Sequence, residues 1–284
     1  MIRVATKGDL TLIALLQDDV LLEFYIWDRD APDGIGDLYT GRVDHIEKAL
    51  AGCFVTLDND LSGFLPDSAG GKSVTQGQYV NVRVTRAGQN GKGPRLRCEE
   101  TPPADKIGLL TRGPGPLAAL AARFPDLGII IDDYALMAEM RPLLAGRMQY
   151  DANSFDPVLQ DEVASLAEPV ASLPHGARLH ITPAPAATLL DVDAAAASHI
   201  QPLTLNKAIL PEICRQIRLR NLSGGILLDF AGLKPAQRRT LLPVLSAALK
   251  SDPLVPTLLG LSHLGFAEIT RRRVYPPLSE RFRL

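Results

Sequence analysis

Short apolar and β-branched runs, broken by glycine, proline and aspartate, dominate the first third of the chain. Within residues 1–35, TLIALL and VLLEFYIW predict two strands, which a turn-rich segment at 31–37 ends. Residues 36–98 contain five more such runs: LYTGRVDHI, AGCFVTLD, SGFLP, GQYVNVRVTR and PRLRC. Five short strands with glycine-rich turns predict a small closed barrel, of which the OB-fold is the common form that binds nucleic acids.

The rest of the chain alternates between helical and extended patterns, as an α/β sheet does. A connector rich in proline and glycine spans 101–116. Residues 117–124 and 135–144 predict helices on either side of the buried strand GIIID, and ARLHIT and ATLLDVD predict two later strands. The expected fold class is therefore α/β with an inserted all-β barrel.

A long helix is predicted between ATLLDVD and the next apolar strand, GILLDF. Over residues 205–222, apolar side chains recur at the i, i+3, i+4, i+7 spacing of one helix face. Gly224 and Gly225 are expected to end this helix. A second helix is predicted over 234–250, with Pro235 in its first turn, and VPTLLGLSHLG and AEITRRRVY close the domain.

Composition narrows the class of protein. The chain has 284 residues, 46% of them hydrophobic, which suits two or three domains with buried cores. No apolar stretch approaches the roughly 18 residues of a membrane span, and the N-terminus lacks the apolar segment of a signal peptide. Cys53, Cys98 and Cys214 form neither a local metal-binding pair nor a disulfide framework. We therefore expect a cytoplasmic protein with reduced thiols.

The charge is distributed unevenly along the chain. From Leu205 to the end there are 13 lysines and arginines and 5 aspartates and glutamates, a net charge of +8. The preceding residues carry 17 basic and 27 acidic side chains, a net charge of −10, so the whole chain carries −2. This asymmetry indicates a C-terminal region that faces a polyanion. The alternative is that the basic residues only line solvated helix faces.

Two predicted strands each carry a carboxylate near their end, Asp191 in ATLLDVD and Asp229 in GILLDF. One helix crosses between them, so the strands are expected to be neighbours whose ends converge on a crevice. Two carboxylates without a cysteine or histidine cluster suit Mg²⁺, which keeps several of its waters. Such an ion activates a water and neutralises charge on a phosphodiester. The alternative is that each aspartate begins a turn or caps the next helix.

Basic and aromatic side chains complete the predicted site. Guanidinium groups around a metal-binding carboxylate pair bind phosphodiesters well. The basic candidates are Arg215, Arg218, Arg220, Lys234, Arg238, Arg239, Arg271, Arg272 and Arg273. In the barrel, Phe54 and Phe64 are candidates for stacking on bases, and Lys92 for touching phosphate. The alternatives are that both phenylalanines belong to the barrel core and that Lys92 is a loop lysine without a role.

Several segments resemble the bacterial ribonuclease E/G family, in the family's order, from about residue 36 to 278. GDLYTGRVDHIEKALAGCFVTLDNDLSGFLP resembles the start of the family's RNA-binding OB-fold, and TLLDVD its catalytic strand motif. ICRQIRLRNLSGGILLDF and LSHLGFAEITRRRVYPPL are similar to two later segments of the family. The resemblance implies an endoribonuclease that hydrolyses single-stranded, often A/U-rich RNA and leaves 5′-phosphate ends.

The resemblance also implies a role for each matching residue. Asp191 and Asp229 fall on the aspartates that hold catalytic Mg²⁺, for which Mn²⁺ can substitute, and Asp193 falls on a catalytic asparagine. Positions that contact RNA in the family's OB-fold correspond to Phe54, Phe64 and Lys92. Arg112, in GLLTRG, falls on the arginine of the pocket that senses a 5′-monophosphate.

The family's fold implies a division of the chain. An RNase H-like body would take residues 1–35 and 117–172, and the OB-fold would take 36–100, joined by the connector at 101–116. A DNase I-like catalytic domain would take 173–284.

Four departures from the family's pattern modify these expectations. Asp193 replaces asparagine, which adds negative charge beside the metal, and Gly232 stands where the family has a second aspartate. Gly113 follows Arg112 where the 5′-sensor has threonine, and the next segment is short, so 5′-end sensing is in doubt. The chain ends at Leu284, before the family's zinc-binding CPxC link. No zinc is therefore expected, and a monomer or weak dimer is expected rather than a zinc-linked tetramer.

Three functions stay open at this stage. The first is a Mg²⁺-dependent endoribonuclease in rRNA processing or mRNA decay. The second is an RNA-binding protein or RNA chaperone with the family fold and little or no cleavage, which the missing sensor threonine, the absent zinc link and the change from asparagine to Asp193 favour. The third is a small-molecule phosphohydrolase, against which the basic region and the barrel weigh.

Overall fold

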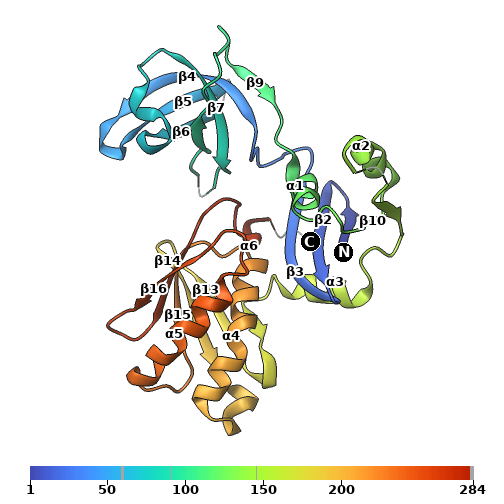
Figure 1. Cartoon of the computed structure of the whole chain (residues 1–284), viewed down its shortest axis with the longest axis vertical. Helices are drawn as coiled ribbons and strands as arrows, with labels where there is room; N and C mark the ends of the chain where they lie inside the picture. Colours follow the sequence, from blue (N-terminus) through green and yellow to red (C-terminus); the bar gives the residue numbers. More distant parts are fainter. Residues whose placement is uncertain (59–60, 90, 145, 282–284) are drawn as a thin grey trace.

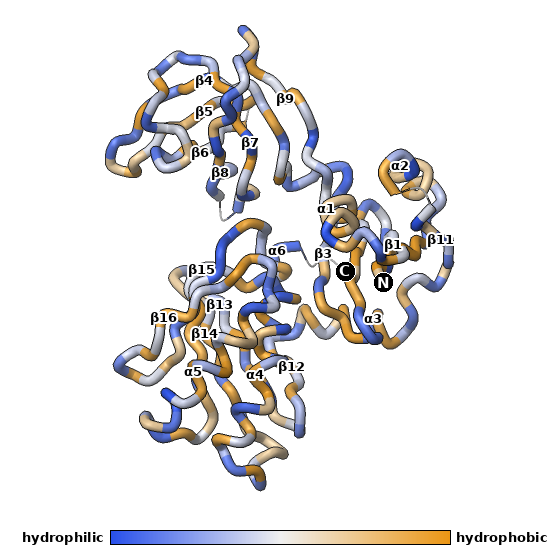
Figure 2. The backbone as a smooth tube through the Cα atoms, in the orientation of Figure 1, coloured by the Kyte–Doolittle hydropathy of each residue, from blue (hydrophilic) through white to orange (hydrophobic). Residues whose placement is uncertain are grey.

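Three β-sheets organise the chain, and Figure 1 shows each of them at the centre of its own lobe. The computed structural model describes residues 1–58, 61–89, 91–144 and 146–281. Figure 2 shows hydrophobic colours along the strands inside each lobe and hydrophilic colours in many of the connecting loops. Of the helices in these ranges, none combines the length and the apolar character that crossing a bilayer requires.

The first sheet has five strands in the order β11-β10-β1-β2-β3. Its strands are β1 (Ile2–Lys7), β2 (Leu10–Gln17), β3 (Val20–Asp28), β10 (Ile129–Ile131) and β11 (Met148–Tyr150). Its helices are α1 (Gly115–Arg123), α2 (Tyr134–Leu144) and α3 (Pro157–Ser165). Helices α1 and α2 bury one face of the sheet through Leu117 and Leu136, and α3 buries the other through Leu159. The sheet is therefore covered on both faces.

The barrel consists of five strands in the order β5-β6-β8-β7-β4, and a further pairing of β5 with β4 closes it. These strands are β4 (Leu38–Glu47), β5 (Gly52–Asp58), β6 (Leu61–Pro66), β7 (Tyr79–Arg86) and β8 (Arg95–Cys98). Strands β6 and β8 pair in parallel, and the other barrel pairs are antiparallel. Cys53, Val55 and Leu57 alternate into the core because successive side chains of a strand point to opposite faces. The predicted five-stranded, OB-like barrel is confirmed.

The segment that was expected to be an irregular connector contributes a strand. Within 101–116, β9 (Gly108–Thr111) pairs with β4, with Leu109 opposite Tyr39. The sheet of the barrel therefore has a sixth strand beside the five that close it.

The chain enters and leaves the barrel at one crossing point, where Asp37 holds the two passes together. The buried Asp37 carboxylate accepts hydrogen bonds from the Gly113 backbone N–H (2.6 Å) and from Arg112 Nη1 (2.9 Å). A Cβ atom on Gly113 would lie 2.1 Å from the carbonyl oxygen of Ile35, so the crossing leaves no room for a side chain there. We call this contact the Asp37 clasp.

The third sheet has six strands in the order β12-β13-β14-β15-β17-β16. They are β12 (Val170–Ser172), β13 (Arg178–Pro183), β14 (Ala187–Asp193), β15 (Gly224–Asp229), β16 (Thr257–Leu261) and β17 (Ala267–Arg271). The helices of this part are α4 (Pro202–Leu219), α5 (Pro235–Leu249) and α6 (Leu278–Arg281). Strand β12 falls before residue 173, so the sheet begins slightly earlier than the predicted catalytic domain.

Helices α4 and α5 cover only one face of this third sheet. Ile209, Ile213 and Leu241 pack there against Leu190 and Leu228. The opposite face, which we call the open face, carries exposed or half-buried side chains. They are Arg178, His180, Thr182, Leu189, Asp191, Asp193, Leu227, Asp229, Glu268 and Thr270. Strict alternation in TLLDVD therefore places its aspartates away from the helices.

Helix α4 ends differently from the sequence prediction. The left-handed residue after it is Asn221, with φ of 49°, whose amide donates to the carbonyl oxygens of Tyr275 and Pro276. Gly224 instead begins β15. An asparagine tolerates this conformation because its side chain can bond to nearby backbone groups.

Candidate functional site

Asp191 and Asp229 lie side by side on the open face. Strands β14 and β15 are parallel neighbours, and their register pairs Asp191 directly with Asp229. Neighbouring strands lie about 4.8 Å apart, so two carboxylates on one face can reach the same ligand. Asp191 is exposed, and the Asp229 side chain is 36% exposed. The prediction that one helix crosses between two neighbouring strands is confirmed.

Arg238 fixes the orientation of Asp229. Its Nη1 donates to Asp229 Oδ1 at 2.5 Å, and its other donors bond to the carbonyl oxygens of Leu233, Phe230 and Gly265. The guanidinium group is thus held by backbone on three sides and is only 16% exposed. Sequence analysis predicted Arg238 as an RNA contact, whereas its main partner is the carboxylate itself.

Asn206, on the helix side of the third sheet, stabilises the segment that follows Asp229. This residue is fully buried in α4, where its amide donates to the carbonyl oxygens of Pro202 and Ala231 and its Oδ1 accepts from the Ala231 backbone N–H. The bonds join the start of α4 to the segment that follows Asp229. Sequence analysis missed Asn206, although a lone asparagine on the apolar face of a helix is a signal that it has buried partners.

Asp193 shares the open face with Asp191, two residues further along β14. Its Oδ1 accepts a hydrogen bond from the Ala195 backbone N–H at 2.9 Å, so it also stabilises the turn that leaves the strand. The alternative role of a strand-end aspartate, to begin a turn, is therefore realised at Asp193.

The donor set matches Mg²⁺ better than a metal with a closed protein cage. Within the described part of the chain, no three His, Cys, Asp or Glu side chains are grouped as a metal site. Mg²⁺ commonly binds through one or two carboxylates and keeps waters at its other positions. Asp191 and Asp229 supply two carboxylates, of which one oxygen, Asp229 Oδ1, is already bonded to Arg238.

A row of side chains crosses the outer face of the barrel. The register pairs His45 with Phe54, Phe54 with Phe64, and Phe64 with Arg95, on four adjacent strands. The His45 and Phe54 rings stack at 4.9 Å, the two phenylalanine rings meet edge-on at 5.4 Å, and Arg95 lies over Phe64 at 5.9 Å. Both phenylalanines are half-buried, so neither belongs to the barrel core.

The row leads to a cleft between the barrel and the third sheet, which we call the basic cleft. Its volume is about 520 Å³, and Arg86, Arg95, Arg272 and Arg273 line it together with Gly224 and Gly225. Burial lowers the pKa of Arg86, and the nearby charges of Arg95 and Arg273 lower it further. Arginines held close together despite their repulsion indicate a place for an anion. Arg272 and Arg273 were predicted from the sequence, whereas Arg86 and Arg95 were missed because their proximity depends on the register of the barrel strands.

Two further candidates lie on the barrel lobe. Lys92 is exposed in the hairpin turn between β7 and β8, where its backbone pairs with Gln89. Arg112 is 62% exposed at the Asp37 clasp, so part of its guanidinium group reaches solvent while Nη1 is bonded to Asp37.

Four predicted RNA contacts need correction, because their side chains bond to partners inside the protein and lie away from the open face. They are Arg215, Arg218, Arg220 and Arg271. Arg215 bonds to Glu212, Glu162 and the carbonyl oxygen of Leu21, and Arg218 to the carbonyl oxygen of Leu22 and to Ser251.

Arg220 and Arg271 are 6% and 4% exposed. Arg220 bonds to the carbonyl oxygens of Ser165, Leu166 and Glu168, and Arg271 to Asp252 and Asn221. Helix α4 covers the face opposite Asp191, so its arginines cannot surround that carboxylate.

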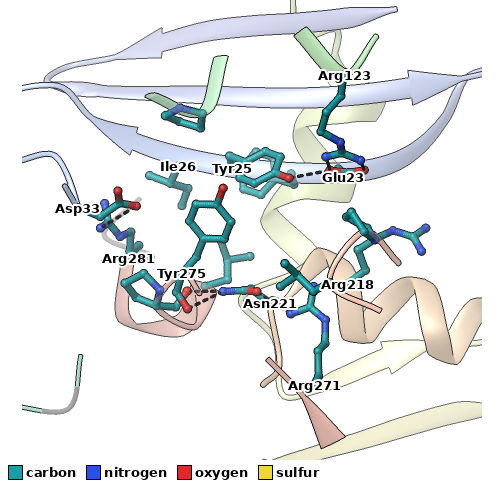
Figure 3. A pocket seen from close by; sticks show the side chains of 16 residues that line it. Glu23, Tyr25, Ile26, Asp33, Arg123, Arg218, Asn221, Arg271, Tyr275 and Arg281 are labelled. Carbon is teal, nitrogen blue, oxygen red and sulfur yellow. Dashed lines mark hydrogen bonds and ion pairs between the residues drawn. The ribbon is translucent and has the colours of Figure 1, made fainter. Parts of the chain in front are cut away.

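A cavity of about 300 Å³ lies between β3 and the segment after β17, and Figure 3 shows the side chains that line it. Its polar side chains pair mostly with each other: Tyr25 and Arg123 bond to Glu23, and Asn221 bonds to the backbone of Tyr275 and Pro276. The Tyr25 ring meets the Tyr275 ring edge-on at 5.7 Å, and this contact joins the first sheet to the segment after β17.

Comparison with known proteins gives a family and several relatives. Residues 134–274 match the model of the ribonuclease E/G family, a region that contains both Asp191 and Asp229. The chain is 36% identical over 114 residues to ribonuclease E of Nostoc, which covers 37% of this chain and 16% of that protein. It is 32% identical over 121 residues to ribonuclease G of Escherichia coli, covering 40% of this chain and 25% of that protein.

A third relative and one solved structure are more distant. Ribonuclease E of Escherichia coli is 29% identical over 128 residues, covering 43% of this chain and 12% of that protein. These matches thus span a quarter or less of each relative's length. The solution structure of GSP13 from Bacillus subtilis matches with 22% identity and a TM-score of 0.20, covering 30% of this chain and 69% of GSP13.

Proposed function

The chain belongs to the ribonuclease E/G family, and from this premise we propose that it is a Mg²⁺-dependent endoribonuclease acting on single-stranded RNA. One observation carries the proposal: Asp191 and Asp229 are directly opposite each other on the open face, inside the region that matches the family. Their carboxylates would hold the ion, with Mn²⁺ as a substitute.

Bound there, Mg²⁺ would lower the pKa of a coordinated water and neutralise charge on the phosphodiester. The side chains of the protein have separate tasks. Arg238 keeps the Asp229 carboxylate in one orientation through its bond to Oδ1. Asp193, on the same face as Asp191, adds negative charge near the reacting phosphate and opposes its approach.

The barrel and the basic cleft supply the substrate class. Phe54 and Phe64 offer aromatic faces that accept any base, which suits unpaired RNA. The preference for A/U-rich RNA is proposed from the family alone. Arg86, Arg95 and Arg273 would bind phosphates of the same strand between barrel and sheet. Duplex RNA would not expose its bases to the aromatic row, so we propose a single-stranded substrate. From the family, we also propose that the products carry 5′-phosphate ends.

We also propose an identity for each of the three sheets, a cellular location and an oligomeric state. The first sheet would be the RNase H-like body, the barrel the OB-fold and the third sheet the DNase I-like catalytic domain. RNA processing and decay would take place in the cytoplasm, with the protein as a monomer or weak dimer. Sensing of a 5′-monophosphate by Arg112 is not part of the proposal, since Asp37 neutralises that arginine.

A second candidate function is RNA binding with little or no cleavage. Two observations favour it: Arg238 occupies one oxygen of Asp229, and Asp193 is bonded to the turn at Ala195. Both contacts reduce the number of carboxylate oxygens that a cation can use.

A cleavage assay distinguishes the two candidates. A fluorescent A/U-rich RNA is incubated with the protein in Mg²⁺, in EDTA, and with the variants Asp191→Asn and Asp229→Asn. Asp126→Asn is the matched control, because Asp126 is an exposed aspartate in the first sheet's lobe. We expect EDTA or either active-face variant to abolish cleavage, and the control to cut like wild type. Cleavage that survives both treatments refutes the mechanism, and steep salt-dependent binding without product selects the second candidate.

A further inference from the structure

The open face carries an unexpected apolar pair beside its carboxylates. Leu189 and Leu227 are opposite each other in the β14–β15 register, one row before Asp191 and Asp229. Leu189 is 42% exposed, and Leu227 is half-buried. Covering two neighbouring leucines on a polar sheet face with an apolar group is favourable, because it removes their apolar surface from water.

The position of this pair relates it to a bound strand. Two residues along a β-strand span about 6.6 Å, so the leucine row is of the order of one nucleotide away from the carboxylates. In the other direction, β15 begins with Gly225 and Gly224, and these glycines line the basic cleft. Leu227 thus lies between the site of cleavage and the arginines that would hold phosphates.

The neighbours of the pair decide which part of a nucleotide fits. Thr182 and Glu268 complete the row, opposite Leu189 and Leu227 respectively. The carboxylate of Glu268 would repel a phosphate placed over this row, whereas it does not repel a neutral base. The apolar surface therefore suits a nucleobase, with its phosphates directed to the carboxylate site on one side and to the basic cleft on the other.

We propose that Leu189 and Leu227 form a platform for the nucleobase next to the scissile phosphate. Contact with the flat face of a base needs no particular hydrogen-bonding pattern, so the platform tolerates any base and favours unstacked, single-stranded RNA. The inference rests on the proposed function for the position of the scissile phosphate. The platform itself is a binding site that can be tested without cleavage.

Binding of a fluorescein-labelled oligouridine, followed by anisotropy in EDTA, tests the platform without metal. Leu189→Ser and Leu227→Ser are expected to weaken binding about fivefold each, because a partly exposed leucine loses its apolar contact. The variant Leu189→Met is expected to keep most of the wild-type affinity, since methionine is apolar and has a similar volume. Leu143→Ser is the matched control, as Leu143 is 67% exposed on α2 in another lobe.

The same titration with an abasic strand of equal length isolates the base contact. Wild type and the two serine variants are expected to bind the abasic strand equally. Wild-type affinity of both serine variants for oligouridine overturns the platform, as does an equal loss on both strands. If the variants behave as expected while wild type shows no cleavage in Mg²⁺, the proposed catalytic activity fails and the platform stands.

Discussion

Replacing Arg271 tests the correction from RNA contact to internal support. Arg271 is 4% exposed, and its Nε donates to Asp252 Oδ2 at 2.7 Å. Its Nη1 donates to Asn221 Oδ1 at 2.7 Å and to the carbonyl oxygen of Leu222. The ion pair with Asp252 is buried on both sides, with each side chain 3% exposed. Arg271→Met removes every donor and leaves the Asp252 carboxylate without its cation.

The magnitude follows from that burial. Removing one partner of a buried ion pair costs about 3–5 kcal/mol, because the remaining charge is uncompensated. With a urea m-value of roughly 2 kcal/mol per molar, the unfolding midpoint of this part of the protein falls by about 2 M. Replacing both partners, as Arg271→Met with Asp252→Leu, costs less than Arg271→Met alone, since no unpaired charge remains.

Urea unfolding followed by circular dichroism, together with RNA affinity below the transition, is the assay. Arg141→Met is the matched control, because Arg141 is exposed on α2, away from the basic cleft, and its loss shifts stability by about 0.5 kcal/mol or less. An Arg271→Met protein that unfolds at the wild-type midpoint, yet binds RNA more weakly, would show that Arg271 faces the substrate and that the buried ion pair does not form.

Two more outcomes follow from single side chains. Arg273→Ser is expected to reduce the slope of log affinity against log salt by about 0.7, as loss of one phosphate contact on a single strand does; an unchanged slope would remove Arg273 from the basic cleft's function. Burial raises the pKa of the Cys214 thiol to about 12. Because the unfolded thiol ionises first as pH rises above its ordinary value near 9, stability is fully present below that pH and falls towards 12. The urea midpoint of wild type should therefore drop between pH 8 and 10 more than that of Cys214→Val, and equal drops would contradict the assignment.

Local patterns predicted much of this fold because they reflect local causes. The alternation in TLLDVD and ILLDF determined which side chains face the helices, and the helix between them made the strands parallel neighbours. Strand β1 and helix α3 were missed, since IRVATK and PVLQDEVAS are short and mix apolar with polar residues, without the long apolar runs of β2 and β3. The strand at 108–111 was missed because glycine and proline around it indicated a loop.

The arginines show where sequence reasoning failed. The spacing of basic residues along a helix does not show whether a given side chain faces solvent, substrate or a buried carbonyl group. Arg215 and Arg220 have partners contributed by α3 and the loop after it, which no spacing within α4 reveals. Arg86 and Arg95 pair across β7 and β8, and their approach to Arg273 depends on how barrel and sheet meet. Register and packing, rather than composition, decided which cations form a site.

The Asp37 clasp has a consequence for how the protein can be altered. The segment that enters the barrel and the segment that leaves it touch at Ile35 and Gly113. Residues 36–112 therefore form an insertion whose two ends lie close together in the first lobe. Among the described residues between 36 and 112, none contributes a side chain to the two hydrophobic clusters that cover the first sheet. A short linker from residue 35 to 113 would thus remove the barrel as a unit and leave the first and third sheets, so that the RNA binding proposed for the barrel and the chemistry proposed for the open face can be studied separately.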